Sequence, residues 1–150
     1  MGHYCWVCGR VRANERFSGK GHARHICKQC ARLPKERRDR VQALRDIERF
    51  LHQSIISAGN VARLRRLRGS SDEDVRRKAA LVLEVALVRP GKRRRWAILA
   101  RTNPGLVDRL TEEGLLPEYA VHAWRAAMEH AEAFSEDGED TDSADGTKER

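Results

Sequence analysis

The sequence has no apolar run long enough to span a membrane, and its N-terminus lacks the apolar segment typical of signal peptides. We therefore expect a cytoplasmic protein, in a compartment where disulfides are rare. The sequence also lacks any arrangement of side chains typical of nucleophilic or general acid–base catalysis, so we do not expect an enzyme.

Cysteine is scarce: the chain has four, in two C-x2-C pairs, Cys5/Cys8 and Cys27/Cys30. Each pair can bind a metal ion through a tight turn, and two pairs together give a closed tetrahedral four-thiolate site. Such a site has no open coordination position, so we predict one structural Zn2+ ion. Gly9 follows the first pair at a position that often needs a positive φ.

Other roles fit these cysteines less well. Two disulfides would require an oxidising compartment. A redox C-x2-C motif usually lies on the strand-to-helix turn of a βαβ unit, and no such unit is evident. An iron–sulfur cluster remains the main alternative to zinc.

Residues 1–33 predict a small zinc module. Phe17, the turn candidate 18–21 and the short run 22–26 predict a β-hairpin within residues 10–26, and a helical pattern follows the second cysteine pair. A knuckle, a hairpin and then a helix carrying the second pair is the order of a treble-clef zinc finger. The available core is small, so the metal should supply much of the folding energy.

The pattern Cys5-x2-Cys8-Gly9-Arg10-Val11-Arg12, then Phe17, then Cys27-x2-Cys30, resembles the zinc finger of certain small-subunit ribosomal proteins. The resemblance covers about thirty residues, and the gap between the pairs is longer here. It implies a module that grips rRNA phosphates with basic residues around the knuckle. In this chain those residues would be Arg10, Arg12, Arg16, Lys20, Arg24 and Lys28.

Treble-clef modules also occur in HNH-type nucleases, and an HNH-like nuclease is an alternative hypothesis. Such an enzyme needs a histidine general base and further metal-binding residues beside the hairpin. His22 and His25 lie in the right region, but no Asp-His pair stands there and no suitably placed Asn follows. We expect both histidines at the surface or against phosphate, and Trp6 packed against Phe17 rather than stacked on a base.

Residues 34–134 predict an α-helical domain. Helices are expected over 34–57, 59–68, 72–89, from the run 92–96 to 101, over 104–113, and over 117–134. Apolar residues recur at helical spacing in the first (Val41, Leu44, Ile47, Leu51, Ile55) and the last (Val121, Trp124, Met128, Ala131). The third helix is apolar almost all round from Ala79 to Val88, so we expect it to be buried.

The segment from Leu64 to Ala86 resembles a HEAT-type helical hairpin. One such unit cannot bury its own apolar face, and no clear second copy is present. The overall prediction is therefore a mainly α fold: a small N-terminal treble-clef zinc module, of β-hairpin plus helix, followed by an α-helical bundle with a HEAT-like hairpin.

Charge is divided unevenly along the chain. Residues 135–150 carry seven acids and two bases, a net charge of −5, so the total of +8 leaves +13 on residues 1–134. A basic body with an acidic tail suggests a polyanion as partner, nucleic acid first. We expect the tail to be disordered.

The densest basic run precedes Trp96 and opens a helix. Cations at a helix start oppose the helix dipole, which favours a functional role in backbone binding. The residues of this run are Lys92, Arg93, Arg94 and Arg95.

Together these features predict a non-catalytic zinc-finger protein that binds nucleic acid, with RNA or the ribosome preferred over DNA. An alternative is a protein-interaction adaptor whose helical domain holds an acidic protein partner.

Overall fold

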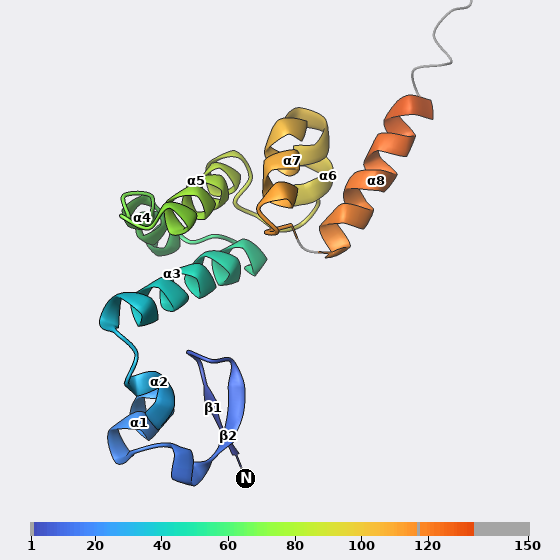
Figure 1. Ribbon diagram of the computed structural model, residues 1–150. Coiled ribbons are helices and arrows are strands. Elements are labelled where there is room, and N and C mark those ends of the chain that lie inside the picture. Colours follow the sequence, from blue (N-terminus) through green and yellow to red (C-terminus); the bar gives the residue numbers. More distant parts are fainter. Residues whose placement is uncertain (1, 117, 134–150) are drawn as a thin grey trace, which may run out of the picture. The chain divides into compact units, whose positions relative to one another are not determined.

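The computed structural model describes residues 2–116 and 118–133, and this part of the chain is mainly helical, as the sequence predicts (Figure 1). The chain divides into two compact units, Met1–Lys92 and Arg93–Arg150. The boundary predicted between residues 33 and 34 stays a prediction, since both sides belong to the first unit. The predicted acidic tail lies outside the described residues. No helix in the described ranges is long and apolar enough to cross a membrane.

The N-terminal residues 2–33, called the cysteine module below, begin with an antiparallel hairpin (Figure 1). Strand β1 (Gly2–Cys5) pairs with β2 (Arg10–Ala13), and Cys5 lies opposite Arg10. The turn between the strands carries the first cysteine pair. Gly9 has a φ of +68°, and its N–H donates to the Cys5 carbonyl at 2.9 Å. This confirms the positive φ expected there, a conformation that glycine adopts without strain.

The hairpin is therefore not where the sequence predicted it. After β2 the chain forms the 3-10 turn η1 (Asn14–Arg16), then the short helices α1 (Gly19–Arg24) and α2 (Lys28–Ala31). Residues 18–21 open a helix rather than a β-turn, although glycine is a poor helix former. Phe17 and Ile26, buried on either side of α1, anchor this segment, so tertiary contacts override local propensity.

The first long helix, α3 (Lys35–His52), ends earlier than the predicted residue 57. Residues 54–56 instead lie antiparallel to 90–92, with hydrogen bonds from the Lys92 amide to Ser54 and from the Ile56 amide to Pro90. β-branched residues are weak helix formers, and this pairing gives their backbone other partners. Ile55 is consequently 68% exposed instead of lying on the helix's apolar stripe, whereas Ile47 and Leu51 are fully buried as predicted.

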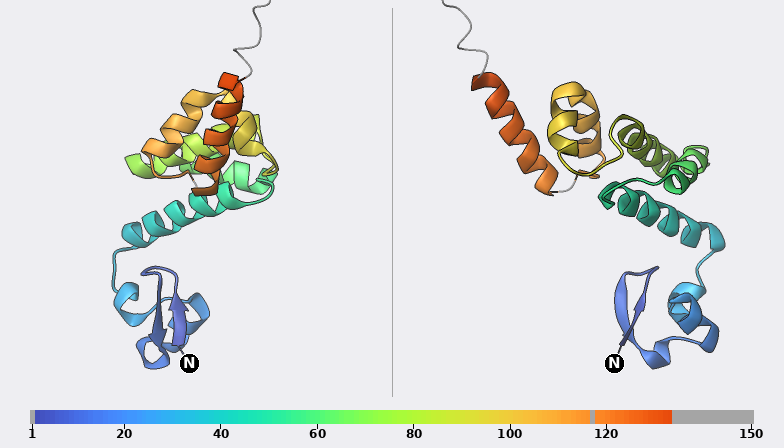
Figure 2. Two further views of the ribbon diagram at one scale, coloured as in Figure 1. Left: turned by 90° about the vertical axis from the view of Figure 1, so that its right-hand side faces the viewer. Right: turned by 180° about the vertical axis from the view of Figure 1, so that it is seen from behind.

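Helices α4 (Ala58–Leu67) and α5 (Glu73–Val88) agree closely with the prediction. Side chains cap both, since Ser57 accepts from the Asn60 amide and Asp72 from the Val75 amide. Helix α5 contacts both α3 and α4, with α4 and α5 side by side (Figure 1, Figure 2). The expectation that α5 is buried to its end is wrong, because Leu87 and Val88 are exposed in its last turn.

The second unit holds α6 (Arg95–Thr102), α7 (Pro104–Glu112) and α8 (Glu118–Ala133). Helix α6 contacts both others, and its Leu99 is fully buried. Asn103 caps α7 by accepting from the Leu106 amide. The predicted core role of Met128 is wrong, since its side chain is 39% exposed. Pro117 and the side chain of Ala131, also part of the prediction for the last helix, lie outside what the structure describes.

Candidate metal centre and its basic surroundings

The four cysteines come together from two segments of the module. Cys5 and Cys8 stand at the hairpin turn, Cys27 directly precedes α2, and Cys30 lies within it. Their sulfur atoms all lie within 4.8 Å of one another. Tetrahedral Zn–S bonds of about 2.3 Å would place the sulfurs about 3.8 Å apart. Small side-chain movements would therefore close the four sulfurs around one metal ion.

The cysteine cluster is also the core of the module. Cys5, Cys27 and Cys30 are buried with Phe17 and Ile26, and Cys8 is half-buried against them. Trp6 packs on the same cluster, and its indole N–H donates to the Arg24 carbonyl at 2.9 Å. This packing agrees with the role predicted for Trp6. With so few other buried side chains, a metal ion bound here would be central to the folding of the module.

Hydrogen bonds favour the thiolate form of Cys5. Burial raises the pKa of the Cys5 thiol, but hydrogen bonds from the backbone of Cys27, Cys8 and Val7 outweigh this and lower it to about 6. The Cys27 N–H lies 3.3 Å from the Cys5 sulfur. Burial raises the pKa of Cys30, and its hydrogen bonds to the other cysteines add to the effect. A bound divalent cation would reverse this, since the metal ligand is the thiolate.

Three histidines gather beside Phe17, outside the metal cluster. The rings of His3 and His25 are stacked 4.8 Å apart, with Nε2 of His3 and Nδ1 of His25 at 2.9 Å. His22 is half-buried against Phe17 and His3, whereas His25 is exposed. His3 was not predicted to contribute, because an isolated histidine two residues before a cysteine gives no sequence signal. Among the described residues, the four cysteines are the one group of His, Cys, Asp or Glu that could hold a metal ion.

The basic residues predicted on the module do not form one cluster. Three of them, Arg12, Arg16 and Lys28, line a groove of about 750 Å³. Arg10, Lys20 and Arg24 are exposed but do not line it. We call the groove lined by Arg12, Arg16 and Lys28 the cationic groove. Its full lining consists of Arg12, Glu15, Arg16, Cys27, Lys28, Gln29 and Arg32. Arg32 was missed in the sequence, although a search for cations following the second cysteine pair would have found it.

The cations of the module differ from those of the helices in their partners. In α3–α5 several basic side chains form ion pairs, such as Arg40 with Asp72 and Asp74, and Arg49 and Arg63 with Asp46. Others on these helices, such as Arg37 and Arg65, form none with the described residues. In the module as described, Arg12, Arg16 and Arg32 form no ion pair. The Nε atom of Arg12 is buried and has no hydrogen-bond partner.

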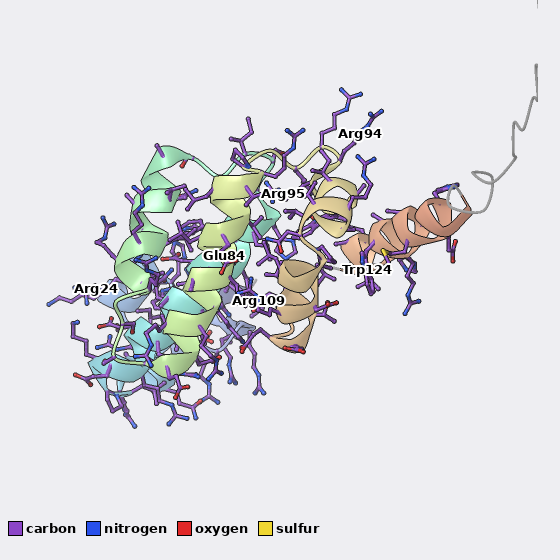
Figure 3. The ribbon with its side chains drawn as sticks, turned by 90° about the horizontal axis from the view of Figure 1, so that it is seen from above. Arg24, Glu84, Arg94, Arg95, Arg109 and Trp124 are labelled. Atoms are coloured by element: carbon purple, nitrogen blue, oxygen red, sulfur yellow. The ribbon has the colours of Figure 1, made fainter. Side chains whose placement is uncertain are left out.

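The residues of the basic run 92–95 differ in how far their side chains are buried. Lys92, Arg93 and Arg94 are exposed, but Arg95 is fully buried, with its guanidinium 6.0 Å from the centre of the Trp96 ring. Arg95 therefore cannot present its guanidinium to a phosphate in solution, which corrects its assignment as a contact residue. Helix α6 begins at Arg95, three residues after the run begins, and Arg95 is buried together with Trp96. Arg94 lies at the turn that leads into α6 (Figure 3).

Comparison with protein-family models, with curated proteins and with solved structures gave no match for this chain. The features from which a function can be inferred are therefore the chain's own: a β-hairpin with a cysteine cluster, followed by helices, with unpaired cations around the cluster.

Proposed function

We propose that this chain is a non-catalytic nucleic-acid-binding protein whose cysteine module holds one structural zinc ion. The observation that carries the proposal is the gathering of unpaired arginines in the module. Acidic partners neutralise several cations in α3–α5, while Arg12, Arg16 and Arg32 of the module have none. Arginines without acidic partners are suited to bind a polyanion.

The charge balance of the module supports the same proposal. Residues 2–33 contain seven Lys and Arg and one acid, Glu15, a net charge of +6 with neutral thiols. Four thiolates around one divalent ion contribute −2, so the metal-loaded module keeps +4. Zinc is favoured as the metal because a closed set of four sulfur ligands is typical of structural zinc sites.

RNA is the preferred nucleic acid, because the two C-x2-C pairs, with Gly9 directly after the first, resemble the zinc finger of certain small-subunit ribosomal proteins. An arginine-rich module also contacts phosphate in a way that depends little on sequence. The protein should therefore bind many RNA sequences with similar affinity.

The test is fluorescence anisotropy of the full chain with single-stranded RNA, single-stranded DNA and duplexes of one sequence, with zinc content measured in parallel. We expect one zinc per chain and binding that weakens steeply between about 50 and 200 mM salt. No binding to any nucleic acid at low salt would refute the proposal. Co-purification of an acidic polypeptide without nucleic acid would favour the adaptor hypothesis.

A further inference from the structure

The cationic groove brings together basic residues from two separate segments of the cysteine module. We infer that this groove is where phosphate groups of the nucleic acid bind, and that the metal ion assembles it. The inference rests on the proposed function and deepens it, because it assigns binding to one face of the module and adds Arg32 to the contact residues.

The two walls of the groove come from the two segments that carry the cysteine pairs. Arg12 and Arg16 come from β2 and η1, which follow the first pair, whereas Lys28 lies between the cysteines of the second pair and Arg32 follows it. The Lys28 ammonium donates to the Glu15 carbonyl at 2.8 Å, across the groove. A metal ion bound by both cysteine pairs joins the two walls, so their spacing depends on the metal.

The chemistry of the lining fits an anion. Four of its side chains are cations and one, Glu15, is a carboxylate. The buried Nε–H of Arg12 has no acceptor. A buried donor without a partner is destabilising, and a phosphate oxygen in the groove would supply the acceptor.

A second groove, on the helices, provides the contrast. It lies against α3, α4 and the start of α5, and its lining holds equal numbers of cations and carboxylates: Arg37, Arg40 and Arg63 with Glu36, Asp39 and Asp72. Arg40 already donates to Asp72 and Asp74, both at 2.8 Å. A phosphate would have to displace those carboxylates, so the groove in the module is the better anion site.

The first experiment compares two double variants that remove the same charge from the same module. The groove variant carries Arg16→Gln and Arg32→Gln, and the control carries Arg10→Gln and Arg24→Gln, exposed residues outside the groove. We expect the affinity of the groove variant for RNA to fall by about tenfold or more, and that of the control by less than about threefold. The slope of the logarithm of the binding constant against the logarithm of the salt concentration should become shallower by about 2 in the groove variant. Zinc content should be unchanged in both.

The second experiment tests the groove without nucleic acid. Inorganic pyrophosphate is titrated into the zinc-loaded full chain, and backbone amide shifts are followed by NMR. We expect the largest shifts at the amides of Lys28, Gln29 and Arg32, and their loss in the groove variant but not in the control.

The outcomes separate this inference from the proposed function. Equal losses of RNA affinity in the two variants would overturn the groove assignment and leave nucleic-acid binding in place. Absence of binding to any nucleic acid by the unaltered protein would overturn the proposed function, and the pyrophosphate shifts would then decide the groove alone. Shifts spread evenly over the module would overturn the groove as a phosphate site.

Discussion

Two residues at junctions of the chain have a backbone conformation that side chains disfavour. Among the described residues other than glycine, His25 and Arg94 have positive φ, at 53° and 56°. His25 follows α1, and Arg94 is the N-cap of α6. The left-handed region costs an ordinary L-residue about 1 kcal/mol or more, so the surrounding structure must impose it.

Replacing Arg94 by glycine should therefore stabilise the protein. We expect Arg94→Gly to raise the free energy of unfolding by up to about 1 kcal/mol, measured by urea denaturation, because glycine relieves the strain. Arg93→Gly removes the same charge at a neighbour without positive φ and should give no gain. Equal stabilities of the two variants would contradict this explanation.

Asp72 combines a helix cap with an ion pair. One carboxylate oxygen accepts from the Val75 amide at 3.0 Å and the other from Arg40 at 2.8 Å. The bond from Val75 is the main cause that lowers the pKa of Asp72, and Arg40 contributes further. A lowered pKa in the folded state means that the ionised carboxylate stabilises the fold above the unfolded-state pKa of about 4. That stabilisation is lost as the pH falls through the folded-state pKa.

Asp72→Ala should lower the free energy of unfolding by about 1 kcal/mol at neutral pH, with a smaller loss for Asp72→Asn, which keeps a capping acceptor. The difference between Asp72→Ala and the unaltered protein should narrow near about pH 3, where the unfolded-state carboxyl is protonated. Urea denaturation at both pH values measures this. A difference that does not change with pH would show that ionisation of Asp72 is irrelevant to the cap.

At the scale of single elements, α5 shows how far burial follows the apolar pattern. Leu83 is 4% exposed, whereas Leu87, one turn later, is 62% exposed. Leu83→Ala should lower the free energy of unfolding by about 2–5 kcal/mol, but Leu87→Ala should change it by less than about 0.5 kcal/mol. Chemical denaturation of the two variants compares the same substitution on one helix. Similar losses would mean that Leu87 is also part of the core.

The helices that the sequence predicts best are those whose ends carry local signals. Asp72 before α5 and Asn103-Pro104 at the start of α7 mark helix starts through side-chain acceptors and the fixed φ of proline. The end of α3 carries no such signal. It is set by hydrogen bonds to residues 90–92, which are far away in the sequence and which local periodicity cannot reveal.

The cysteine cluster was predictable from the sequence and the cationic groove was not. Two C-x2-C pairs determine which atoms converge, because a four-thiolate site needs all of them. The groove depends on the path of residues 14–26 between the pairs, where helix α1 replaces the predicted hairpin. That path decides that Arg32 joins Arg12 and Arg16 while Arg24 does not.

At the scale of the whole molecule, the parts differ in what holds them together. The helices α3–α5 and α6–α8 bury aliphatic residues such as Ile47, Leu64, Val82 and Leu99, whereas the core of the cysteine module is centred on sulfur. The module should therefore depend on the metal and the helices should not.

Chelation of the metal should remove protection from hydrogen exchange across residues 2–33 and leave α4, α5 and α6 protected. Mass spectrometry of exchanged peptides measures this, and restoring Zn2+ to the same sample is the control for irreversible damage. Loss of protection that extended into α5, or a module that stayed protected without metal, would contradict the prediction that the module depends on the metal and the helices do not.

The Lys28–Glu15 contact and the two cysteine pairs join the two walls of the cationic groove, so the proposed metal and polyanion would be thermodynamically coupled ligands. Coupling free energies are reciprocal: the factor by which metal raises affinity for nucleic acid is the factor by which nucleic acid raises affinity for metal. Bound RNA should accordingly make the zinc harder to extract, and a chelator competition with and without RNA measures that factor. The protein's metal occupancy would then report whether it is bound to its partner.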